Sequence, residues 1–160
     1  MKERVKLDAL DWKIIDELQR DGALSHPELA ERIGSTAPSC WRRVRQLEEL
    51  GVFRGTVRLV DQQVLGQSVN VLCHVRMRNH TLDNVEAFEA FVRTEPRIME
   101  CFSMSGEWDY QLRVVAEDVA DYEVFLMRTL LKHPSVAGAA SHFALRMVKY
   151  QTAVPVPSGQ

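Results

Sequence analysis

The order of strands and helices predicted in the second half of the chain restricts its fold more than any other feature. Four segments have the alternating or β-branched composition of strands: 69–77, 98–104, 109–115 and 138–150. Two segments between them have apolar residues at helical spacing: 82–96 and 119–134. The resulting order, βαββαβ, is that of the ferredoxin-like fold. We therefore expect an antiparallel sheet with both helices on one face and an open opposite face that can pair with another molecule.

The first third of the chain predicts three short helices, each with its own start and stop signals. In LDALDWKIIDELQRDG, Asp8 is a plausible N-cap and Gly22 ends the helix. In SHPELAERIG, Ser25 and Glu28 have the spacing of a capping box, and Gly34 follows the last apolar residue. Ala30, four residues before Gly34, is small enough for the close approach of two helices in this unit.

The third predicted helix, TAPSCWRRVRQLEELG, has an apolar side and a basic side. Thr36 is its expected N-cap, and Cys40, Val44 and Leu47 form the inward stripe. Five arginines lie within residues 41–58 against only two acidic residues, although the whole chain has a net charge of −2. Two short helices, a glycine-containing turn and a basic third helix are typical of a helix-turn-helix DNA-binding unit, although any small helical bundle can imitate the pattern.

Composition shifts divide the chain into two expected domains. We predict a winged helix-turn-helix domain over 1–60, in which VFRGTVRLV supplies a short wing hairpin or a connecting strand. A polar linker over 61–67 leads to the βαββαβ domain over 68–150. An irregular, proline-rich tail follows over 151–160. The predicted fold class is thus α+β.

Composition also narrows the class of protein. The chain is 46% hydrophobic and 26% charged, has no apolar run of membrane-spanning length, and begins with a charged stretch, so we expect a cytoplasmic protein. Its three cysteines are far apart and form no C-x-x-C pair, which argues against a disulfide framework or a zinc site. Cys73 and His74 are adjacent and would point to opposite faces of a strand. We predict no metal and no cofactor.

Four stretches, in order over about residues 7–150, resemble the Lrp/AsnC (leucine-responsive and asparagine-responsive) family of transcription regulators. They are LDALDWKIIDELQRDG, LAERIGSTAPSCWRRVRQLEELGVFRG, MECFSMSGEWDYQLRVV and HPSVAGAASHFALRMVK. The chain departs from the family pattern at Ser35-Thr36, where the family has Leu-Ser. It also departs at Ser135 and Ser141, where glycine and threonine are usual. The resemblance implies a DNA-binding regulator that responds to an amino acid or a related metabolite.

If the third helix enters the major groove, its outward side chains reach base edges. We expect Arg42 to contact guanine and Gln46 to contact adenine, with Ser39 beside them and Thr36 at the start of the helix. Arg43, Arg45, Arg54 and Arg58 are expected to neutralise phosphates. Trp41 has two expected places, against the first helix or against the sugar backbone. Each of these residues has an alternative interpretation as an ordinary surface side chain.

The resemblance places an effector between subunits, near the glycine-containing turn between the second and third strands. The corresponding residues here are Gly106, Trp108, Asp109, Tyr110 and Ser141. A zwitterion needs a carboxylate for its ammonium, which Asp109 can supply, and donors for its carboxylate, which the turn amides and Ser141 can supply. The alternative is that Gly106 and Asp109 only shape the turn.

The expected partners are a palindromic operator in double-stranded DNA, the effector, and further copies of the chain. The open sheet face is the expected dimer surface, and the family commonly assembles further, often into octamers. Two other classes stay open. One is a tetrapyrrole-processing enzyme similar to the family, whose His- and Arg-rich segments are not evident here. The other is a ligand sensor without DNA binding, which would not need the basic third helix.

Overall fold

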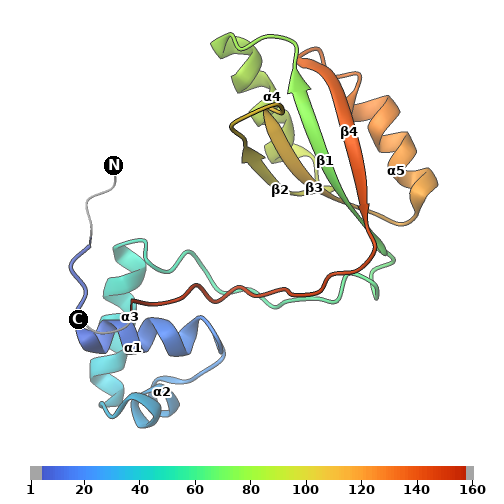
Figure 1. Cartoon of the computed structure of the whole chain (residues 1–160). Coiled ribbons are helices and arrows are strands. Elements are labelled where there is room, and N and C mark those ends of the chain that lie inside the picture. Colours follow the sequence, from blue (N-terminus) through green and yellow to red (C-terminus); the bar gives the residue numbers. More distant parts are fainter. Residues whose placement is uncertain (1–4, 158–160) are drawn as a thin grey trace. The chain divides into compact units, whose positions relative to one another are not determined.

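The computed structural model describes residues 5–157, which form two compact units (Figure 1). One unit contains the chain up to Leu59 and again from Lys149 onward, and the other spans Val60–Val148. We call the first the DNA-binding unit and the second the ligand-binding domain, after the functions that the family resemblance implies. None of the described helices is long and apolar enough to cross a membrane.

The DNA-binding unit contains three capped helices: α1 (Ala9–Leu18), α2 (His26–Ile33) and α3 (Ala37–Glu49). Asp8 accepts hydrogen bonds from the amides of Leu10 and Asp11, which confirms the predicted N-cap. The Ser25–Glu28 capping box and the Thr36 cap are confirmed as well. Gly34 ends α2 in the left-handed conformation, at a φ of 68°.

A small apolar core joins these three helices. Each contributes side chains that are at most 1% exposed: Ile14 from α1, Leu29 from α2, and Cys40 and Leu47 from α3. Val44 packs against this cluster with partial burial, so the predicted inward stripe of α3 is confirmed. Burial of this stripe leaves the opposite side of α3 facing solvent.

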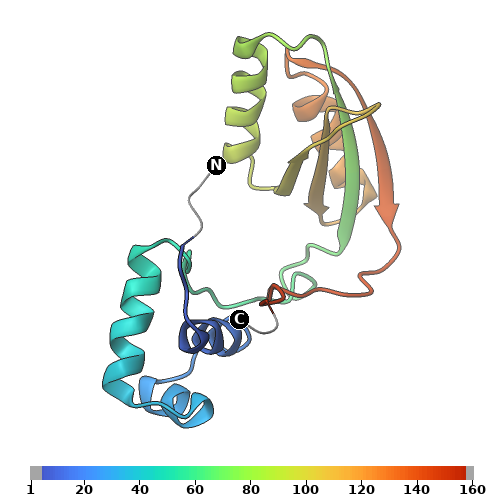
Figure 2. The ribbon, with the colours of Figure 1, turned by 60° about the vertical axis from the view of Figure 1, so that its left-hand side comes forward.

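The ligand-binding domain has the predicted βαββαβ order. Its elements are β1 (Val69–Met77), α4 (Leu82–Thr94), β2 (Ile98–Ser103), β3 (Tyr110–Ala116), α5 (Val119–Phe125), the π-helix η1 (Leu126–Leu130) and β4 (Val136–Ala144). All strand pairs are antiparallel and the strand order is β2-β3-β1-β4. Both helices cover one face of the sheet, as Figure 2 shows.

Alternation along the strands separates a core face from an open face. Val71, Cys73 and Val75 of β1 are fully buried under the helices, with Phe88 of α4 and Phe125 of α5. Leu72 and Arg76, which alternate with these residues along β1, point to the other face and are exposed. Phe102 of β2 pairs with Gln111, lies on this open face and is 55% exposed.

Two expectations about strands were wrong. Residues 52–60 form no strand, because no other segment among the described residues pairs with them, so the wing hairpin is missing. The last strand was predicted over 138–150, but β4 spans Val136–Ala144. Its register explains the end: Ala144 pairs with Asn70 near the beginning of β1, and only Val69 of β1 remains beyond that pair. Leu145 is fully exposed.

The second helix of the domain also differs from the prediction of a single helix over 119–134. It begins with Asp118 as N-cap and changes to a π-helix from Leu126. The helical part ends at Leu130, before Pro134. Wide π turns are uncommon and brief, and the apolar spacing in the sequence does not distinguish them from α turns.

Candidate DNA-binding surface and effector site

The outward side of α3 carries polar side chains that face solvent and not the rest of the unit. Arg42 and Gln46 are exposed, and Ser39 is half-buried. Arg42 has no ion-pair partner among residues 5–157, unlike Arg43 and Arg45. Thr36 has a different task, because its hydroxyl accepts the Ser39 amide at 3.4 Å and caps the helix. Within residues 5–157, the helix therefore presents Arg42 and Gln46 with side-chain donors and acceptors that have no partner.

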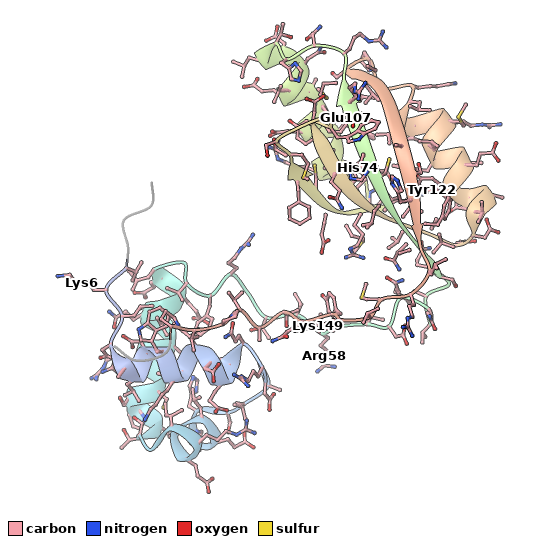
Figure 3. All side chains as sticks on the ribbon, viewed as in Figure 1. Lys6, Arg58, His74, Glu107, Tyr122 and Lys149 are labelled. Carbon is pink, nitrogen blue, oxygen red and sulfur yellow. The ribbon has the colours of Figure 1, made fainter. Side chains whose placement is uncertain are left out.

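Trp41 and Arg45 lie on the flank of this surface. Trp41 is 51% exposed, so about half of its surface is available for contact. The Arg45 guanidinium lies 5.7 Å from the Trp41 ring centroid and pairs with Glu49 at 3.1 Å. Arg54 and Arg58 are exposed in the segment after α3 (Arg58 is labelled in Figure 3).

Arg43 connects two helices within the unit. One guanidinium nitrogen lies 2.7 Å from both Asp8 and Asp11, and the side chain is only 24% exposed. Hydrogen bonds to Asp11 and then Asp8 raise the pKa of Arg43. The Asp11 amide and the Arg43 guanidinium lower the pKa of Asp8. We expected Arg43 to neutralise phosphate; in the structure its Nη1 pairs with Asp8 and Asp11 and holds α3 against the start of α1.

The glycine turn between β2 and β3 brings Trp108 onto the open sheet face. Gly106 has a φ of 116°, a conformation that disfavours a side chain. The Trp108 ring lies 4.7 Å from the Arg76 guanidinium and 5.9 Å from the His74 ring. Arg76 also pairs with Glu107 at 2.9 Å. Figure 3 labels Glu107 at the turn and His74 on β1.

Asp109 holds the turn that follows β1. One carboxylate oxygen accepts the Met77 amide at 2.7 Å, and the other lies 2.6 Å from Nε2 of His80. Burial acts to raise the pKa of Asp109, but the hydrogen bonds with His80 and Met77 outweigh it and hold the pKa below its usual value. The carboxylate is thus ionised, partly accessible and already engaged, in agreement with the turn-shaping alternative.

Tyr110 and Ser141 lie on the core face instead. Tyr110 is 6% exposed, and its ring lies 4.8 Å from the Phe88 ring, tilted by 48°. The Ser141 hydroxyl is 2.6 Å from the Tyr122 hydroxyl, opposite Cys73 on β1. Asp109 immediately precedes β3, which flanks β1 on one side, and Ser141 lies in β4, which flanks β1 on the other side. One protomer therefore brings Gly106, Trp108 and Asp109 together at the turn, but not Tyr110 or Ser141.

Sequence reasoning missed the neighbours that hold these groups: Arg76, His80 and Tyr122. Each is a polar residue with an unremarkable local pattern. Their roles depend on which residues the strand register places opposite one another, and the residue types alone contain no such signal.

Family models match both parts of the chain. An AsnC-type helix-turn-helix domain matches residues 7–48, and an Lrp/AsnC ligand-binding domain matches residues 70–154. A leucine-responsive regulatory protein of Rhizobium meliloti is 40% identical over 93% of this chain and 96% of its own length. A Bkd operon transcriptional regulator of Pseudomonas aeruginosa is 39% identical over 94% and 99%.

Solved structures match more than nine-tenths of the chain. A transcriptional regulator of Neisseria meningitidis, in complex with L-Met, has a TM-score of 0.89 at 35% identity, covering 94% of this chain and 97% of that chain. An AsnC family transcriptional regulator of Agrobacterium tumefaciens has a TM-score of 0.88 at 36% identity, covering 93% and 97%. The names of these relatives point to regulators rather than to enzymes. The chain belongs to the Lrp/AsnC family and is a DNA-binding transcriptional regulator.

Proposed function

We propose that α3 contacts base edges in the major groove of a palindromic operator, with Arg42 and Gln46 as the recognising side chains. The supporting observation is that Arg42 is exposed at the centre of a capped helix and has no carboxylate partner among the described residues, whereas Arg43 and Arg45 do. Free donors on an outward helix face suit guanine and adenine edges. Trp41, Arg45 and Arg54 flank this face and contact the backbone. The protein acts where chromosomal DNA is, in the cytoplasm.

Two copies are needed for such binding, because one small unit makes few phosphate contacts. The open sheet face is the surface on which they pair. It exposes Leu72 of β1, Phe102 of β2 and His142 of β4. Large apolar side chains exposed on one face are typical of a surface that binds another protein. A face-to-face pair of sheets buries them, and further association of dimers gives the higher assemblies common in this family.

The effector is an amino acid bound at the turn formed by Gly106, Trp108 and Asp109. A regulator with the same fold and 35% identity was solved in complex with L-Met, which supports this class of ligand. The ionised Asp109 attracts the ammonium, which displaces His80 from the accessible carboxylate oxygen. Tyr110 and Ser141 support the site from the core face, or complete it from a second copy.

A thermal-shift screen with the twenty amino acids tests this site. At 100 times its dissociation constant, a ligand should add about 2.7 kcal/mol to the free energy of unfolding. We expect a shift with L-methionine or another apolar amino acid. Asp109→Asn should lose it, because the amide keeps an acceptor for Met77 but has no charge for the ammonium. Glu107→Gln, two residues away and 72% exposed, should keep it. A shift that survives Asp109→Asn would place the ammonium elsewhere, and no shift with any amino acid would refute the ligand class.

A further inference from the structure

The C-terminal segment leaves the ligand-binding domain and packs on the DNA-binding unit. From Lys149 onward the chain belongs to the same compact unit as α1, and the red segment in Figure 1 runs back toward that helix. The Gln19 side chain, at the end of α1, donates to the Val154 carbonyl at 2.7 Å and accepts from the Val154 amide at 2.9 Å. One amide side chain thus satisfies both backbone polar groups of Val154, as a neighbouring strand would.

An apolar contact follows two residues later. Val156 packs against the core cluster of the unit, where Trp12 and Ile33 lie. Together with Pro157 it forms one wall of a hollow of about 390 Å³ between α1 and α2. Val154 is 68% exposed. The two valines of Val-Pro-Val-Pro therefore differ, because Val154 faces solvent and Val156 packs against the unit. The prolines fix the backbone before docking, which lowers the entropy cost of ordering the segment.

Because the chain leaves the DNA-binding unit and later returns to it, the docking of the C-terminal segment restricts the orientations of this unit. The chain passes from the DNA-binding unit into the ligand-binding domain after Leu59 and returns after Val148. The DNA-binding unit is therefore attached to the ligand-binding domain at two points of the chain instead of one. A single irregular connection leaves a unit a wide range of orientations, whereas a second attachment closes a loop and narrows that range.

We propose that residues 149–157 form a strap that restrains the DNA-binding unit and so determines the spacing of the two half-sites that a dimer recognises. This inference rests on the proposed binding of two units to one palindromic operator. Restraint raises the effective concentration of the second unit at one particular spacing and lowers it at others. Loss of the strap reduces affinity at the preferred spacing, but it does not alter the contacts that each unit makes with its own half-site.

The test measures binding to duplexes that carry two half-sites, selected from a random pool, with the spacer changed in steps of one base pair. Val156→Asp places a charge in the apolar contact, near Asp16 and Glu17, and Gln19→Ala removes both hydrogen bonds. Val154→Asp is the matched control, since it adds the same charge at an exposed site. The wild type and the control should show one sharp optimum. Both strap variants should show a flat profile, with about tenfold weaker binding at the optimum and single half-site affinity within twofold of wild type.

A sharp optimum in both strap variants would overturn the proposal. Gln19→Ala is the milder change and decides the result if Val156→Asp loses helical circular dichroism. If the wild type itself shows no preferred spacing, the pairing of two units is wrong, and the docking of the strap is decided by hydrogen exchange. Faster exchange of α1 amides in the two strap variants than in Val154→Asp supports docking, and equal exchange contradicts it.

Discussion

Replacing Arg42 by alanine should sharply reduce discrimination between the operator and unrelated DNA while leaving the protein fully folded. A bidentate contact between arginine and guanine contributes about 1–3 kcal/mol of discrimination, equivalent to roughly 5- to 160-fold in affinity. The variant should keep the weak, salt-dependent binding that the other cations supply. Equilibrium titration of the selected duplex and of a scrambled duplex, at one salt concentration, measures the ratio.

Arg43→Ala is the matched control, with the same change of charge one residue along the same helix. Because Arg43 pairs with Asp8 and Asp11, its removal should cost about 1–3 kcal/mol of stability. At a temperature where the variant is folded, its discrimination between the duplexes should resemble that of the wild type. If Arg42→Ala discriminates normally while Arg43→Ala does not, the recognising face of α3 has been assigned to the wrong side chains.

Replacing Phe88 by alanine should destabilise the ligand-binding domain by about 3–5 kcal/mol, because a fully buried phenylalanine leaves a cavity that its neighbours fill only in part. Phe88 packs against Tyr110, Phe91 and His133, so the cavity would open between α4 and the sheet. Urea unfolding monitored by circular dichroism measures the loss. The same experiment shows whether the DNA-binding unit unfolds in a separate transition.

Phe102→Ala makes the same truncation on the open face and should behave differently. Its side chain is 55% exposed in the protomer, so the fold should survive. Association should weaken instead, which sedimentation velocity over a range of protein concentrations detects. An unchanged dimer in Phe102→Ala would argue against pairing through the open face. A small loss of stability in Phe88→Ala would argue against the packing of α4 on the sheet.

Local signals in the sequence were sufficient for much of the fold. The caps at Asp8, Ser25 and Thr36 use side chains within three residues of the amides they accept, so the sequence predicts them directly. Strand β1 has the predicted bounds because its apolar residues alternate over its whole length. The order of elements follows from the same periodicities.

Features that depend on distant residues were not predictable in the same way. The end of β4 is determined by the length of β1, and the return of the tail is determined by Gln19, 135 residues before Val154. Arg43 looked like a DNA contact because its helix is basic, and only the packing of α3 on α1 shows that Asp8 and Asp11 bind it. Four of the five effector candidates lie within residues 106–110, yet the turn directs Trp108 and Tyr110 to opposite faces of the sheet.

Footprinting of the selected operator tests the central claim most directly, namely that a pair of α3 helices recognises DNA through the major groove. The wild-type protein should protect guanine N7, which lies in the major groove, in two patches separated by about 10 base pairs or a multiple of that distance. Arg42→Ala should lose that protection and Arg43→Ala should keep it. A single protected patch, protection confined to the minor groove, or an unchanged footprint in Arg42→Ala would contradict the account.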